Sequence, residues 1–135
     1  MATIETIYLG DLRTEATHVA SGNKVITDAP VDNNGKGEYF SPTDMVCAAL
    51  GSCMLTIMGI SDKTHGFDID GTRLKIDKIM AANPRRIAEI KIEMDLPHDY
   101  DEKHKRIIEL SAKECPVANS LGADVKKTLI FNYRK

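Results

Sequence analysis

The chain has 135 residues, of which 42% are hydrophobic and 28% are charged, and its formal net charge is -2 at pH 7. These values are ordinary for one soluble domain with a buried core, and they exclude the strongly basic surface typical of nucleic-acid binding. No apolar run reaches the ~18 residues of a membrane span, and the N-terminus lacks the pattern of a secretory signal. We expect a single cytoplasmic domain over residues 1–135, without nucleic-acid or membrane partners.

The first third of the chain is predicted to form strands and one long loop. Residues 2–9 and 14–20 alternate weakly between apolar and polar side chains, and residues 24–28 form a short β-rich run. These patterns predict two or three antiparallel strands. Residues 27–42 contain an Asn-Gly pair, a further glycine and two prolines, which together predict a loop. Loops of this length in compact domains often carry function.

A long helix is predicted to follow this loop. Ser41 or Thr43 can cap it, Pro42 suits its first turn, and Asp44 favours the positive end of the helix dipole. Gly66 is expected to end it. The apolar residues of this segment point in all directions around the helix axis, so the helix should be buried on most sides. In a chain this small, a sheet can cover one side and a second subunit the other.

The second half of the chain alternates strands and helices. Residues 68–82 and 85–96 each alternate with period two around an Asn-Pro-Arg-Arg turn, which predicts a hairpin. Residues 99–114 have the acidic start and apolar spacing of an amphipathic helix. A short second helix and a final strand at residues 125–134 complete the chain. This order predicts an α+β fold with mainly antiparallel pairing.

The three cysteines, Cys47, Cys53 and Cys115, are an odd number, which argues against a secreted disulfide framework. Residues 115–122 predict the short helix, and Cys115 would lie at its start, where the helix dipole lowers a thiol pKa. Cys47 and Cys53 are separated by about 240° around the long helix, so they face different sides. If any two thiols meet, Cys53 and Cys115 are the better candidates. The alternative is that all three cysteines fill the core.

The remaining polar side chains give weaker signals. No Cys-x-x-Cys or His-x-x-x-His spacing occurs, so a zinc site is not supported. The four histidines are scattered: His18, His65, His98 and His104. Arg13 could hold a thiolate and orient an oxygen-rich substrate if it lay beside a thiol. An arginine in an early strand or turn is otherwise usually a surface residue.

Three segments together resemble the OsmC-like family, which includes the organic hydroperoxide resistance proteins. They are YLGDLRTEATHVASG, TDAPVDNNGKGEYFSPTDMVCAALGSCMLTIMGI and CPVANSL. The resemblance covers nearly the whole chain in the right order, and the combination is more specific than any one segment. It implies an OsmC-like α+β fold, in which an antiparallel sheet packs on a long buried central helix within an intertwined homodimer.

The resemblance also implies thiol peroxidase chemistry. By position, Cys53 resembles the peroxidatic cysteine, Cys115 the resolving cysteine, and Arg13 the arginine that activates the reactive thiolate. The expected substrate is a small-molecule hydroperoxide, and a dithiol reductant of the lipoyl or thioredoxin type would recycle the Cys53–Cys115 disulfide. Neither a metal nor an organic cofactor is expected.

One position departs from the pattern of the family. Many of its peroxidases carry a glutamate ten residues before the reactive cysteine, where it pairs with the arginine, and this chain has Thr43 there. Asp44 is one residue further on and about 100° around the helix. Glu38, or an acid within residues 27–34, is the other candidate partner of Arg13. The alternative function is therefore a small-molecule-binding or redox-responsive protein on the same fold, without efficient peroxidase turnover.

Overall fold

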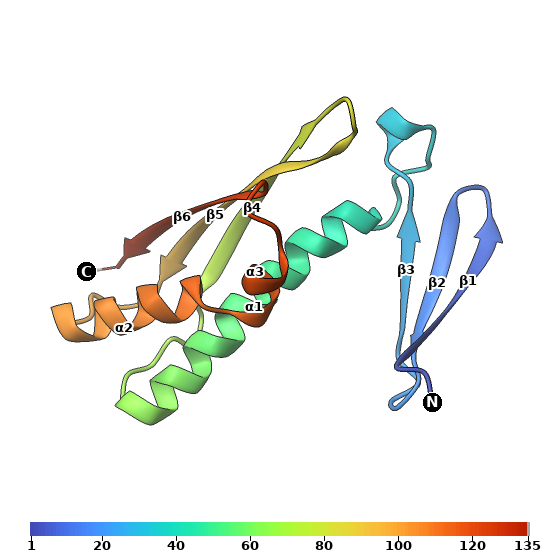
Figure 1. Ribbon diagram of the computed structural model, residues 1–135. Helices are drawn as coiled ribbons and strands as arrows, with labels where there is room; N and C mark the ends of the chain where they lie inside the picture. The colour runs from blue at the N-terminus through green and yellow to red at the C-terminus, as the bar shows by residue number, and fades with distance from the viewer. Residues whose placement is uncertain (135) are drawn as a thin grey trace. The chain divides into compact units, whose positions relative to one another are not determined.

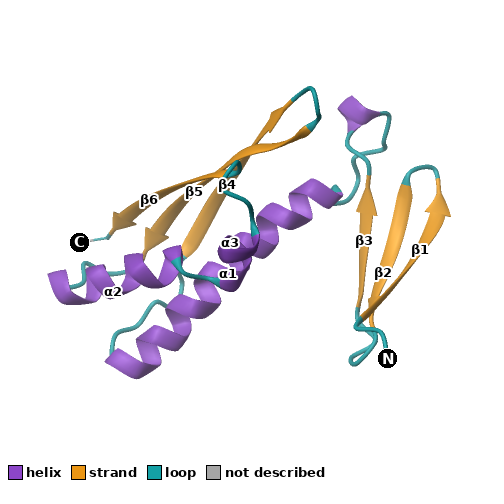
Figure 2. Cartoon of the chain, viewed as in Figure 1, coloured by secondary structure: helices purple, strands orange, loops and turns teal. Residues whose placement is uncertain are grey.

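The computed structural model describes residues 1–134, which form two compact units, one over Met1–Val46 and the other from Cys47 onward. Each unit contains its own three-stranded sheet, as the ribbon and the secondary-structure colouring show (Figures 1 and 2). Helices and strands occur in the order predicted from the sequence, and the α+β class is confirmed.

The first unit is built on an antiparallel sheet in the order β1-β2-β3. Its strands are β1 (Ile4–Gly10), β2 (Arg13–His18) and β3 (Lys24–Asp28). The predicted loop after β3 contains one short 3-10 helix, Val31–Asn33. It folds back closely on itself: a Cβ added at Gly35 would lie 1.8 Å from the carbonyl oxygen of Ala29. Only glycine fits this approach, which fixes the loop beside the end of β3.

The long helix α1 spans Pro42–His65 and begins and ends as predicted. The Ser41 N–H donates to Asp44 Oδ2, and the Asp44 N–H donates to Ser41 Oγ, each at 3.0 Å. These reciprocal bonds form a capping box, with aspartate in place of the more common glutamate or glutamine. Gly66 follows the helix with a φ of 77°, the left-handed conformation that favours glycine at a helix end.

Within the second unit, α1 packs one side against the sheet and leaves a stripe exposed. Leu50, Met54 and Met58 are fully or almost fully buried, whereas Ile60 is 58% exposed. Gly51 lets the helix approach the sheet, since a Cβ there would lie 2.7 Å from Ile76 Cδ1. By length and composition, α1 is apolar enough to cross a membrane. Within this chain, only 28% of its most apolar 18-residue stretch is buried. Core helices of soluble folds have the same composition.

The sheet of the second unit is mixed. Strands β4 (Arg73–Ala81) and β5 (Arg86–Leu96) form the predicted antiparallel hairpin. Strand β6 (Lys126–Tyr133) pairs parallel to β5, after the connection through α2 (Glu102–Lys113) and α3 (Pro116–Ser120). The expectation of an antiparallel sheet therefore holds for β4 and β5 but not for β6. A parallel neighbour needs a long crossover, and the two helices supply it.

The core of the second unit lies between the sheet and the helices. Helix α2 is amphipathic as predicted, and Ser111 Oγ on α2 lies 2.7 Å from Ser61 Oγ on α1. The fully buried side chains, with at most 2% of their surface exposed, are Leu50, Met54, Met58, Ile90, Ile92, Met94, Leu96, Ile108, Ala112 and Cys115. The core thus includes one of the predicted reactive cysteines.

Candidate functional site

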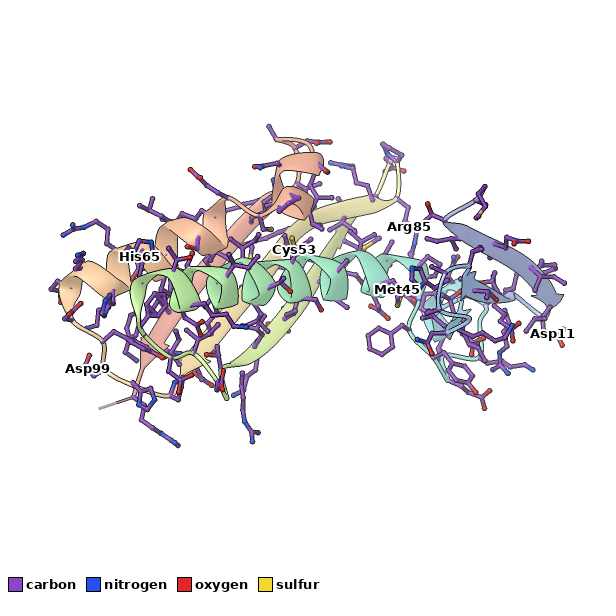
Figure 3. All side chains as sticks on the ribbon, turned by 90° about the horizontal axis from the view of Figure 1, so that it is seen from below. Asp11, Met45, Cys53, His65, Arg85 and Asp99 are labelled. Carbon is purple, nitrogen blue, oxygen red and sulfur yellow. The ribbon has the colours of Figure 1, made fainter. Side chains whose placement is uncertain are left out.

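Two thiols from distant parts of the sequence meet in the second unit. Cys53 lies midway along α1 (Figure 3). Its side chain is half-buried. Cys115 directly precedes α3 and has no exposed surface. Cys53 packs against the buried cluster that contains Cys115, its thiol lies close enough to raise the pKa of the Cys115 thiol, and neither residue is in a disulfide. The structure therefore brings together the pair that sequence reasoning favoured.

Cys115 caps the N-terminus of α3. Its Sγ accepts a hydrogen bond from the Ala118 N–H at 3.3 Å, the Val117 backbone N–H also favours the thiolate, and Pro116 occupies the first turn. Burial nevertheless raises the pKa of the Cys115 thiol, and the neighbouring Cys53 raises it further. The expectation that the helix start lowers this pKa is wrong, because loss of water around the buried sulfur outweighs the two backbone donors. Cys115 thus keeps its proton at neutral pH.

The third cysteine occupies a different position. Cys47 lies on α1 with 4% of its surface exposed and belongs to the buried core cluster, whereas Cys53 only packs against that cluster. The angular separation predicted from the sequence accounts for this difference. The cysteine that raises the pKa of Cys115 is Cys53. Cys47 therefore serves as a matched control in tests of the thiol pair.

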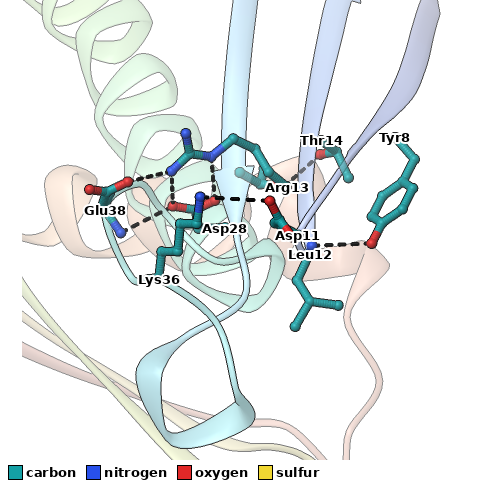
Figure 4. A network of polar contacts seen from close by, with 9 residues as sticks. Tyr8, Asp11, Leu12, Arg13, Thr14, Asp28, Lys36 and Glu38 are labelled. Atoms are coloured by element: carbon teal, nitrogen blue, oxygen red, sulfur yellow. Dashed lines mark hydrogen bonds and ion pairs between the residues drawn. The ribbon is translucent and has the colours of Figure 1, made fainter.

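In the first unit, Arg13 and Asp28 form a two-point ion pair (Figure 4). The two residues are direct partners in the register of β2 and β3. Arg13 Nε donates to Asp28 Oδ1 at 2.7 Å, and Nη2 donates to Oδ2 at 2.8 Å. The Asp28 side chain is only 1% exposed. Hydrogen bonding from Arg13 holds the pKa of this carboxyl below its usual value, although burial acts in the opposite direction.

Glu38 and Tyr39 complete the surroundings of Arg13. Nη2 also donates to Glu38 Oε1 at 2.6 Å, and the Tyr39 ring centroid lies 4.8 Å from Arg13 Cζ. The hydrogen bonds to Asp28 and Glu38 raise the pKa of the Arg13 guanidinium above its usual range. Arg13 therefore carries a fixed positive charge whose position is set by three neighbours from β3 and the following loop.

The structure distinguishes among the acids considered for Arg13. Glu38 contacts Arg13, whereas Asp44 caps α1 and is not a hydrogen-bond partner of Arg13. Thr43, at the position of the family glutamate, has its hydroxyl 3.2 Å from Ser41 Oγ. Asp28 is one of the acids within residues 27–34 that the sequence offers as candidates, but only strand register shows that it faces Arg13.

A separate acidic cluster lies after α1. Carboxylate oxygens of Asp62, Asp68 and Asp70 lie within 4.8 Å of one another. Asp62 is buried and accepts a hydrogen bond from the Ile69 N–H at 3.3 Å, while the other two are exposed. Among the described residues, this is the only group of three or more acidic, histidine or cysteine side chains close enough to share an ion. It contains none of the thiols or of the arginine partners.

Comparison with known proteins places this chain beside one sequence family and several solved structures. The sequence model of the OsmC-like protein family matches residues 35–129. One solved structure is of a Psychrobacter arcticus protein that is named for osmotic stress induction and a detoxification response. It is 47% identical to this chain, and the match has a TM-score of 0.93 over 97% of this chain and 96% of that chain. A Legionella pneumophila organic hydroperoxide resistance protein has a TM-score of 0.76 at 12% identity, over 98% of each chain. At this low identity, the likeness to the Legionella pneumophila protein shows only a shared fold.

A curated relative, an uncharacterized protein of Methanocaldococcus jannaschii, is 29% identical over 105 residues. The match covers 72% of this chain and 54% of that protein, so the chain spans about half the length of this relative. The relative therefore supports the likeness in sequence, and it assigns no activity.

Proposed function

Because this chain belongs to the OsmC-like family, we propose that it is a thiol-dependent peroxidase that reduces organic hydroperoxides. Solved proteins of this fold include ones named for organic hydroperoxide resistance and for osmotic stress. The observation that carries the proposal is the contact between Cys53 and Cys115. A protonated, buried Cys115 beside a half-buried Cys53 suits a resolving thiol beside a reactive one.

In the proposed first step, Cys53 reacts as a thiolate, the nucleophilic form of cysteine. Its sulfur attacks the terminal oxygen of the hydroperoxide, and the O–O bond breaks. The alkoxide leaves with a proton as the alcohol, and Cys53 becomes a sulfenic acid. Arg13 is proposed to stabilise the thiolate and to orient the peroxide oxygens, since a guanidinium is a permanent cation with several donors.

In the proposed second step, the Cys115 sulfur attacks the sulfur of the Cys53 sulfenic acid. The S–S bond forms, the S–O bond breaks, and the oxygen leaves as water with the proton of Cys115. An external dithiol, of the lipoyl or thioredoxin type, then reduces the disulfide by exchange and is itself oxidised to a disulfide. The cycle requires no metal and no organic cofactor.

We propose that the working form is one domain per chain in an intertwined cytoplasmic homodimer. Helix α1 supports this assembly, because only 28% of its most apolar 18-residue stretch is buried within one chain. Such exposure in an apolar helix is typical of a surface that another subunit covers. The exposed stripe includes Ala49, Ser52, Thr56 and Ile60.

One observation favours a second candidate function. Arg13 is already neutralised by Asp28 and Glu38, and Thr43 occupies the position of the family glutamate. An arginine bound in this way suits a small-molecule-binding or redox-responsive protein whose thiols pair without rapid peroxide turnover. The two candidate functions require the same fold and the same pair of thiols, and they differ in the rate of peroxide turnover.

One assay separates the candidates. The purified protein is mixed with cumene hydroperoxide or hydrogen peroxide, and dihydrolipoamide is supplied as the dithiol. Turnover that is lost in Cys53→Ser and Cys115→Ser but kept in Cys47→Ser supports the peroxidase. Disulfide formation without turnover supports the second candidate. Turnover that survives in Cys53→Ser and disappears in Cys47→Ser contradicts the assignment of the reactive cysteine.

A further inference from the structure

Arg13 is held by two carboxylates that differ in burial and in number of contacts (Figure 4). The Asp28 side chain is 1% exposed and the Glu38 side chain is 63% exposed. We propose that Asp28 is a fixed anchor for Arg13 and that Glu38 is a releasable clamp, whose departure frees one edge of the guanidinium for an anionic sulfur or oxygen. That this anion is the Cys53 thiolate or a peroxide oxygen rests on the proposed function.

The contacts of Asp28 explain why it is the anchor. Its two oxygens accept hydrogen bonds from Arg13 Nε, from Arg13 Nη2 and from the backbone N–H of Glu38, at 2.7, 2.8 and 3.1 Å. If Arg13 moved away, a buried carboxylate would lose its compensating charge, which is strongly unfavourable. Asp28 therefore holds the Nε side of the guanidinium in every step of the reaction.

Glu38 is held much less firmly. Its side chain makes one hydrogen bond, from Arg13 Nη2 to Oε1, and water can solvate the carboxylate when this bond breaks. Exposed ion pairs of this kind contribute little to stability. The backbone of Glu38 stays in place because its N–H donates to Asp28. Release of the clamp is thus a side-chain rotation that leaves the loop where it is.

The charge around Arg13 explains what the release achieves. One guanidinium faces two carboxylates, and the nearby Lys36 is itself opposed by Asp11 at 3.9 Å. A further anion therefore faces a net negative charge while Glu38 is bound, and this excess disappears when the Glu38 side chain leaves. Within the described chain, Arg13 Nη1 makes no hydrogen bond. Once Glu38 leaves, Nη1 and the freed N–H of Nη2 form a two-donor edge, the geometry that guanidinium groups use to bind anions.

The test uses thiocyanate, a small anion with a sulfur atom, and follows the side-chain Nε–H signal of Arg13 by ¹H–¹⁵N NMR. Glu38→Ala is expected to bind thiocyanate about two- to fivefold more tightly than the natural chain, the range that an exposed ion pair contributes. Glu15→Ala is the matched control, because Glu15 is an acid of the same sheet paired with Lys24 at 3.2 Å. Its affinity for thiocyanate should not change.

Asp28 is tested in parallel with Asp28→Asn and the conservative Asp28→Glu. The first should expose the Arg13 Nε–H to rapid exchange, because Asp28 Oδ1 accepts its hydrogen bond, and the second should restore part of that protection. Thiocyanate binding in Glu38→Ala that is equal to or weaker than in the natural chain overturns the clamp. If Glu38→Ala tightens binding but the natural chain turns over no hydroperoxide, the clamp stands and the proposed peroxidase function fails.

Discussion

The sulfur of Cys115 accepts a hydrogen bond from the backbone N–H of Ala118 and so caps helix α3. The same thiol lies near Cys53 on α1, which raises its pKa. One buried atom therefore links the stability of a short helix to the redox chemistry that we propose. The two roles can be separated, because a hydroxyl can cap a helix but cannot form a disulfide.

Cys115→Ala should lower the free energy of unfolding by about 0.5–2 kcal/mol, the range for losing a helix cap. Cys115→Ser should cost less, because its Oγ can accept the same hydrogen bond from Ala118. Urea unfolding under reducing conditions measures both. Equal losses in the two variants would show that the cap contributes nothing.

Cys115→Ser should also trap the first intermediate of the proposed cycle. Without a resolving thiol, the Cys53 sulfenic acid can form but has no partner for a disulfide. After one equivalent of cumene hydroperoxide, dimedone should label Cys53, as detected by peptide mass spectrometry. Cys53→Ser should not be labelled at residue 53 or elsewhere. Labelling of Cys47 in the Cys115→Ser variant would argue against Cys53 as the reactive residue.

The Arg13–Asp28 pair predicts a loss of stability in acid. The pKa of Asp28 is lowered from its usual 3.8 in the folded chain, so its contribution is present above that pH and is lost as the pH falls through the folded value. Asp28→Asn should therefore be less stable at pH 7 and lose less stability on acidification. Urea midpoints between pH 7 and pH 2 measure the difference. A parallel shift at every pH would rule out titration of Asp28 as the cause.

Tyr100 predicts a loss of stability in alkali. Burial raises the pKa of Tyr100 from 10.0 to about 12, and its hydroxyl donates to the Asp68 carbonyl oxygen at 2.6 Å. A raised pKa gives stability that is present below pH 10 and lost as the pH rises toward the folded value. The loss should reach about 2–3 kcal/mol. Tyr100→Phe should flatten this part of the profile, and an unchanged slope would assign the loss to another group.

The exposed stripe of α1 predicts the assembly state. Ile60 is 58% exposed within one chain, and a lysine there would place a charge in the proposed subunit interface. The natural chain should sediment at twice its chain mass, and Ile60→Lys should sediment as a monomer. Ile79→Lys is the control, since Ile79 is 42% exposed on β4. A monomeric natural chain at micromolar concentration would exclude a stable homodimer.

Several features of the fold follow from neighbouring residues alone. The capping box of Ser41 and Asp44, the end of α1 at Gly66 and the alternation of β4 and β5 depend on contacts a few residues apart. Periodicity and capping preferences report such contacts directly. The expected order of elements was confirmed for this reason. The parallel pairing of β6 was not predicted, because it depends on how α2 and α3 return the chain to the sheet.

The sequence by itself determined the α+β class, the limits of the long helix and the list of groups with reactive chemistry: Arg13, Cys53 and Cys115. Only the tertiary structure decided how these groups are held. It placed Asp28 opposite Arg13 through strand register, and it buried Cys115 so that its pKa rises although it lies at a helix start. Local sequence fixes backbone conformation, whereas charge compensation and loss of water depend on atoms brought together from distant parts of the chain.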